Sequence, residues 1–249
     1  MKNIIILCEP RTGSNVLCEL FFSYNNFIVL NEFFTERIEE KLAPHYSMMS
    51  DDMKNSFYEN FNIENKTVPG LIDFLNANPK SSLDFLDKLT LKYRLIKIHN
   101  FTFNDLNLSF LLDDPNTKFI LLNRTSKIKQ YVSNEVANQT QEWYNVDTSN
   151  KKIWVVPEKF LKFEKESLKW YSSIESKLIE KNHNFLKINY EEDLENIKQD
   201  QITLKISKWL TDNKILARTN AYKLSRYRKQ NLSDLEHVIL NYSQIKDFL

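Results

Sequence analysis

Residues 3–24 have the sequence NIIILCEPRTGSNVLCELFFSY, in which an apolar run is followed by a turn and then by a segment with helical periodicity. The run at 3–8 predicts a short buried strand, and apolar residues between Val16 and Tyr24 recur at the spacing of a helix face. Gly13 stands in the turn and is one of only two glycines in 249 residues, whereas average usage predicts roughly seventeen. A glycine in so glycine-poor a chain indicates a backbone demand that other residues do not meet.

This strand, turn and helix predict an anion-binding loop. The backbone N–H groups of residues 12–15 are expected to point outward at the N-terminus of the helix, where aligned peptide dipoles add partial positive charge. Arg11 adds a full charge beside them. The alternative is an ordinary strand-to-helix turn in which Ser14 caps the helix. The segment alone leaves both interpretations open.

The whole chain, residues 1–249, predicts a single α/β domain of the P-loop-like type, with a central, mostly parallel sheet flanked by helices. A polar segment at 35–90 is expected to form a helical insertion beside the sheet, and residues 217–232 a late basic loop. Helices are predicted from Pro157 and from a capping box at 233–236. The five strand candidates are 3–8, 27–30, 94–98, 118–122 and 185–189.

Composition and charge narrow the function classes. The net charge is only +1 with both signs mixed along the chain, which argues against a general nucleic-acid binder. The first strand begins at residue 3 without a leader pattern, and no apolar run reaches the roughly 18 residues of a membrane span, so a soluble cytoplasmic protein without stable membrane insertion is expected. The four histidines and the cysteines Cys8 and Cys18 lack metal-ligand spacing, so no metal site is predicted.

A second anion-competent feature follows the strand predicted at 118–122. Arg124 stands at the carboxyl end of this strand, and the next helix carries Ser133 and has Thr125 or Ser126 as a candidate cap. In open α/β sheets ligands bind outside the carboxyl ends of the strands, which is also the edge of the anion-binding loop. Two such features predict a ligand with two separated anionic groups; the alternative is a surface arginine and an ordinary helix hydroxyl.

These residues resemble a known family. The segment Pro10–Asn15 with its flanking strand and helix resembles the 5′-phosphosulfate loop of sulfotransferases that use 3′-phosphoadenosine 5′-phosphosulfate (PAPS), and Arg124 with Ser133 looks like their 3′-phosphate site. Residues 137–143, ANQTQEW, are similar to the A-x-Q-T-x-x-W run of the bacterial trehalose 2-sulfotransferase family and related nodulation-type carbohydrate sulfotransferases. Weaker similarity extends to residues 31–34, 94–99, 189–194 and 228–230.

The resemblance implies an enzyme that moves a sulfuryl group from PAPS, as co-substrate and without a metal, to a hydroxyl of a carbohydrate or glycolipid. Glu32 is the implied general base, His99 an acceptor contact or alternative base, and Trp143 a candidate wall of the acceptor pocket. Each has a purely structural alternative as a surface, strand-end or helix-end residue. The implied donor-binding residues are Arg11, Thr12, Gly13, Ser14, Asn15, Arg124, Ser133 and, in the late basic loop, Lys229.

Departures from the family keep other functions open. Asn123 stands where relatives often carry a second basic residue, and Thr125 where they carry an acidic one. A nucleotide kinase or NTPase on the same plan is one alternative, although the Lys and Ser/Thr that its phosphate loop needs are Ser14 and Asn15 here. A non-catalytic nucleotide- or glycan-binding relative is another. The resemblance also implies a possible homodimer, but no residue pattern in this chain indicates a subunit interface.

Overall fold

The computed structural model describes residues 3–22, 24, 27–34, 93–141, 143, 151–195, 199–210 and 234–246, with isolated positions between 55 and 84. The predicted insertion at 35–90 therefore lies almost entirely outside the described residues. The predicted basic loop at 217–232, including Lys229, lies wholly outside them.

The core of the protein is a five-stranded sheet in which every strand pair is parallel. The order is β2-β3-β1-β4-β5, so that the first strand is central and ligand-binding loops gather at one edge. All five predicted strands are confirmed to within one residue at each end. They are β1 Asn3–Cys8, β2 Phe27–Asn31, β3 Tyr93–His99, β4 Lys118–Asn123 and β5 Leu186–Asn189.

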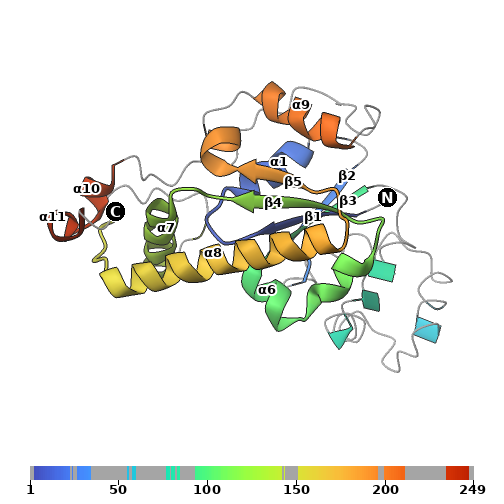
Figure 1. Ribbon diagram of the computed structural model, residues 1–249, viewed down its shortest axis with the longest axis horizontal. Helices are drawn as coiled ribbons and strands as arrows, with labels where there is room; N and C mark the ends of the chain where they lie inside the picture. The colour runs from blue at the N-terminus through green and yellow to red at the C-terminus, as the bar shows by residue number, and fades with distance from the viewer. Residues whose placement is uncertain are drawn as a thin grey trace.

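Helices cover both faces of the sheet, as a parallel sheet requires (Figure 1). Helices α1 (Ser14–Phe22) and α9 (Gln199–Leu210) lie on one face, and α6 (Asn100–Asp105), η1 (Leu108–Asp113) and α8 (Pro157–Glu180) lie on the other. All six β1 residues are buried because their side chains alternate between these two layers. Within the described part of the chain, no helix is long and apolar enough to cross a membrane.

A third apolar cluster joins α7 (Lys127–Thr140) to the C-terminal segment beyond the carboxyl ends of the strands. The capping box was expected to open one helix, and Asp234 does accept a hydrogen bond from Glu236 N. The helix nevertheless breaks into α10 (Leu235–Val238) and α11 (Tyr242–Ile245). The physical reason is a β-bridge between Ile239 and Ile153, which buries Ile239 in the cluster.

Candidate anion-binding site

The turn after β1 requires glycine for two reasons. Gly13 has φ +80°, and a Cβ at this position would lie only 2.4 Å from Cδ2 of Tyr190. The backbone demand inferred from the sequence is therefore confirmed as a left-handed conformation together with a close approach. Arg11 is also left-handed, with φ 65°, and the first bond of α1 runs from Leu17 N to Gly13 O at 3.2 Å.

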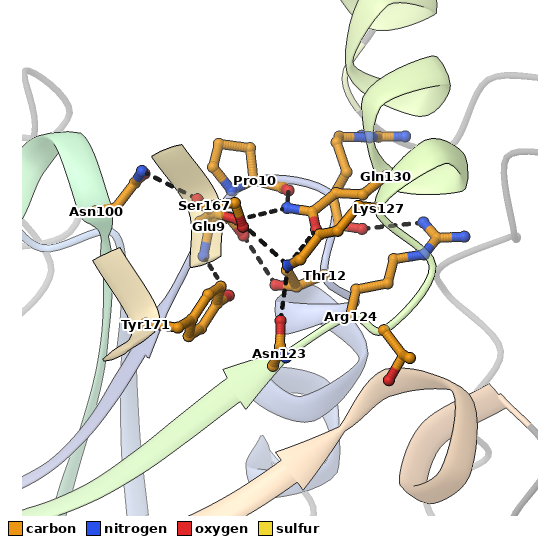
Figure 2. Close-up of polar contacts among 12 residues, drawn as sticks. Glu9, Pro10, Thr12, Asn100, Asn123, Arg124, Lys127, Gln130, Ser167 and Tyr171 are labelled. Atoms are coloured by element: carbon orange, nitrogen blue, oxygen red, sulfur yellow. Dashed lines mark hydrogen bonds and ion pairs between the residues drawn. The ribbon is translucent and has the colours of Figure 1, made fainter. Parts of the chain in front are cut away.

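Three consecutive carbonyls of the β1–α1 loop (residues 9–13) accept hydrogen bonds from the protein interior (Figure 2). The Glu9 carbonyl accepts from Thr12 Oγ1 at 2.8 Å, and the Pro10 carbonyl accepts from Gln130 Nε2 at 3.0 Å. The Arg11 carbonyl accepts from Arg124 Nη1 at 3.1 Å. Ser14 and Asn15 of the first turn of α1 line the adjoining cavity, so this helix presents its partly positive N-terminal end there.

A cavity of about 490 Å³ opens at this edge of the sheet. It brings together six of the predicted site residues: Arg11, Ser14, Asn15, Glu32, His99 and Trp143. The predicted donor-binding residues Thr12, Gly13, Arg124 and Ser133 are not among the residues that line it. The described lining residues are Pro10, Arg11, Ser14 and Asn15 from the loop and α1, Glu32 just after β2, Lys97 and His99 from β3, and Phe101, Asn134, Asn138 and Trp143 around the mouth.

The floor of the cavity carries a carboxylate between two cations. Glu32 Oε1 lies 2.7 Å from Lys97 Nζ and 3.2 Å from His99 Nε2. Lys97 Nζ also donates to Asn15 Oδ1 at 2.6 Å, which ties the carboxyl end of β3 to the first turn of α1. Lysine in a buried strand needs such partners, since its ammonium is otherwise costly to bury.

Glu32 and His99, which form an ion pair, are both shifted toward their charged forms. The hydrogen bond from His99 holds the pKa of Glu32 far below its usual range against the effect of burial, and Lys97 lowers it further. Burial acts to lower the pKa of His99, but contacts with Cys8 and Glu32 outweigh it and raise this pKa to about 9. At neutral pH the cluster is therefore a carboxylate facing an imidazolium and an ammonium.

The two anion-competent features predicted from separate parts of the sequence lie side by side. Arg11 Nε donates to Ser133 Oγ at 2.8 Å, and Arg11 Nη1 donates to the Trp143 carbonyl. Burial, followed by the neighbouring Arg124, lowers the pKa of Arg11 to about 10, which leaves it charged at neutral pH.

Arg124 is buried, with 7% of its surface exposed, and is held by the protein itself. Its guanidinium lies over the Tyr190 ring at 4.7 Å, and its Nε is 3.4 Å from Glu191 Oε1. The Glu191 carboxylate also accepts from the backbone N–H of Thr125 at 2.8 Å and of Ser126 at 3.2 Å. Glu191 therefore caps the N-terminus of α7 through the two N–H groups just before it, whereas the predicted cap residue Ser126 makes no side-chain cap bond.

Several polar residues in or near the cavity were not predicted from the sequence. Lys97 could have been identified from the sequence, since a lysine inside the largely apolar strand RLIKIH signals the need for a buried partner. Glu9, a charged residue directly after the first strand, had the same signal. Asn134 and Asn138 reach the cavity mouth from α7 and had none, because exposed asparagines on a helix are ordinary.

The fold and the cavity define a P-loop-like α/β domain with an anion-competent loop at the carboxyl edge of its sheet. No protein-family model matches the sequence, and no curated protein is similar enough to count as a match.

Proposed function

We propose that this protein is a sulfotransferase that moves a sulfuryl group from PAPS to a hydroxyl of a carbohydrate or glycolipid. The observation that carries the proposal is the convergence of Arg11, the N-terminal turn of α1 and the carboxylate of Glu32 on one cavity. Two features support the proposal: the loop has the strand, turn and helix order of a phosphosulfate loop, and the Glu32 carboxylate lines the same cavity and can accept a proton.

The charges of the cavity favour a donor with adjacent negative groups. Arg11, Lys97 and His99 are cationic at neutral pH, and among the described residues that line the cavity Glu32 carries the only carboxylate. A phosphosulfate carries a charge on its phosphate and another on its sulfonate, and a cavity with excess positive charge attracts and orients such a group. The α1 N-terminus adds N–H donors without adding a side chain.

The transfer is in line. The acceptor oxygen bonds to sulfur as the bond from sulfur to the bridging oxygen breaks, which releases adenosine 3′,5′-bisphosphate and leaves a sulfate ester. The acceptor proton passes to the Glu32 carboxylate. Arg11 and the α1 N–H groups stabilise the charge that develops on the leaving oxygen.

Lys97 provides a reason for Glu32 to become more basic when the donor binds. In this structure its ammonium is shared between Glu32 and Asn15, 2.7 Å and 2.6 Å away. A bound phosphosulfate competes for the same ammonium, and weakening the Lys97–Glu32 contact raises the pKa of Glu32. Proton transfer to Glu32 is thereby favoured in the complex rather than in the free protein.

The mouth of the cavity suits a neutral, hydroxyl-rich acceptor. Phe101 stacks on His99 with ring centroids 5.4 Å apart and is 49% exposed, and Trp143 is 41% exposed. Aromatic faces of this kind pack against the apolar faces of sugar rings. The side-chain amides of Asn134 and Asn138 line the same mouth and can both donate and accept hydrogen bonds.

Glu32→Gln tests the mechanism. The amide cannot take the proton, so turnover is expected to fall at least about a hundredfold while nucleotide affinity is kept. The assay is transfer of labelled sulfuryl to disaccharides, glycolipids and small alcohols. The matched control is Glu175→Gln, which removes a carboxylate of α8 that pairs with Lys187 of β5. This variant is expected to be fully active. Wild-type turnover in Glu32→Gln would remove Glu32 from the mechanism.

Thermal shift separates the classes of ligand. Adenosine 3′,5′-bisphosphate is expected to raise the unfolding midpoint, whereas ATP with Mg²⁺ is not, because only a ligand of the folded state stabilises it. Arg124→Ala is expected to abolish the bisphosphate response while still unfolding cooperatively. Stabilisation by ATP with Mg²⁺ alone indicates a kinase or NTPase, and bisphosphate binding without transfer to any acceptor indicates a binding protein.

A further inference from the structure

A buried carboxylate lies beneath the β1–α1 loop and does not line the cavity. Glu9 is the first residue after β1 and has only 3% of its surface exposed. Side chains from three helices converge on it: Asn100 of α6, Gln130 of α7 and Ser167 of α8 (Figure 2). A carboxylate with so many partners has a single well-defined position.

Glu9 makes hydrogen bonds through both its side chain and its backbone. Its Oε2 accepts from Ser167 Oγ at 2.6 Å and from Gln130 Nε2 at 3.0 Å, and its Oε1 accepts from Asn100 Nδ2 at 3.4 Å. Its backbone N–H donates to the Tyr171 hydroxyl at 3.2 Å, which in turn donates to the carbonyl at the end of β4, 2.7 Å away.

A neighbouring cation balances the charge of Glu9. Lys127 Nζ lies 3.7 Å from Glu9 Oε2, with 5% of its side chain exposed. It also donates to Asn123 Oδ1 at 2.8 Å and to Gln130 Oε1 at 3.2 Å. Because the pair is neutral as a whole, the carboxylate beneath the loop does not repel an anion bound above it.

Gln130 connects this network to the loop. It is completely buried, and its Nε2 donates both to Glu9 Oε2 and to the Pro10 carbonyl, each at 3.0 Å. The carboxylate therefore fixes the orientation of the amide that holds the Pro10 carbonyl inward. The next residue, Arg11, is then held in its left-handed conformation with its side chain against Ser133.

We propose that Glu9 is a positioning residue of the donor site, which through Gln130 holds Pro10 and Arg11 in the conformation that binds the phosphosulfate. The identity of the donor rests on the proposed function, whereas the ordering of the loop does not. Glu9 is buried and does not line the cavity, so its proposed effect on binding is indirect.

The first test is a mutant cycle read out as the dissociation constant of adenosine 3′,5′-bisphosphate by titration calorimetry. Glu9→Ala and Gln130→Leu are each expected to weaken binding by about tenfold, and the double variant by no more than either, because both remove the same buried hydrogen bond. Glu9→Gln is expected to recover wild-type affinity to within about threefold, since an amide oxygen accepts from Gln130 as the carboxylate does.

The second test does not depend on the donor. Hydrogen exchange of backbone amides in residues 9–17 is expected to rise by at least about tenfold in Glu9→Ala and to return to normal in Glu9→Gln, with α9 unchanged in both. Ile174→Val, a core change in α8, is the control for general loosening and is expected to change neither loop exchange nor affinity.

The two tests separate the two proposals. If the wild-type protein does not bind the bisphosphate but Glu9→Ala still loosens the loop, the proposed identity of the donor is refuted, whereas the role of Glu9 in ordering the loop is supported. Unchanged loop exchange in Glu9→Ala overturns the role of Glu9 whatever the affinity. Faster loop exchange with unchanged affinity, or additive losses in the cycle, overturns the link between loop order and donor binding.

Discussion

Gly13→Ala is the most informative single substitution in this protein, since it alters the β1–α1 loop without removing a charge. Two costs add. A Cβ in the left-handed conformation at φ +80° costs about 1–2 kcal/mol. The same Cβ would lie 2.4 Å and 2.7 Å from two carbons of the Tyr190 ring, and overpacking of this kind costs about 1–3 kcal/mol. The free energy of unfolding is expected to fall by about 2–5 kcal/mol.

Binding is expected to suffer together with stability. The Tyr190 ring that must move also supports the Arg124 guanidinium, 4.7 Å from its centroid, and Arg124 holds the Arg11 carbonyl. A shifted ring therefore disturbs both predicted phosphate contacts. Adenosine 3′,5′-bisphosphate affinity is expected to fall by about tenfold or more, which corresponds to at least about 1.4 kcal/mol.

The assay is urea unfolding followed by tryptophan fluorescence, with stability obtained by linear extrapolation. In a Tyr190→Ala background the steric part disappears, so Gly13→Ala is expected to cost only its backbone part, about 1–2 kcal/mol. Asn107→Ala is the control, a left-handed residue at φ 47° in an exposed turn, and is expected to cost about 1 kcal/mol at most. A cost below about 1 kcal/mol for Gly13→Ala, or the same cost in both backgrounds, would refute the reasoning.

Two further predictions concern the charged clusters on either side of the loop. His99 has a pKa of about 9 against the ordinary 6.5, so its stabilising effect is complete below pH 6.5 and is lost as the pH rises through 9. The stability advantage of wild type over His99→Asn is expected to shrink by up to about 3 kcal/mol across this range, and a pH-independent difference would contradict the charged pair. Glu191→Gln weakens the carboxylate cap of α7 and is expected to lower the free energy of unfolding by about 1 kcal/mol in chemical denaturation. The control is Glu192→Gln at the exposed neighbouring position, which is expected to leave stability unchanged. Equal losses in the two variants would exclude the cap.

The elements that could be predicted are those whose signal is local. The strands follow from short apolar runs, most clearly β1 and β4, because a strand buried on both faces needs consecutive apolar residues whatever it pairs with. Helix α8 follows equally from Pro157 and a stripe of buried residues. The prediction of one continuous C-terminal helix was wrong, because the helix is interrupted by a bridge between Ile239 and Ile153, which are far apart in the sequence.

The candidate site likewise has features that could be predicted from the sequence and features that could not. Arg11, Glu32 and His99 were predictable as residues at the carboxyl ends of strands or just after them, where parallel topology gathers polar groups. The protonation states of Glu32 and His99 could not be predicted from the sequence. The low pKa of Glu32 and the raised pKa of His99 depend on distances of 2.7 Å and 3.2 Å that only folding creates.

By itself, then, the sequence determined the α/β class, the strand positions and the glycine turn, because periodicity and backbone freedom are properties of neighbouring residues. Only the tertiary structure decided what surrounds that turn: Tyr190 against Gly13, Glu191 on the N-terminus of α7, and Glu9 under Pro10 through Gln130. These contacts join segments up to 177 positions apart, as in Tyr190 and Gly13. A buried polar group is costly without a partner, and packing determines which partner lies within reach.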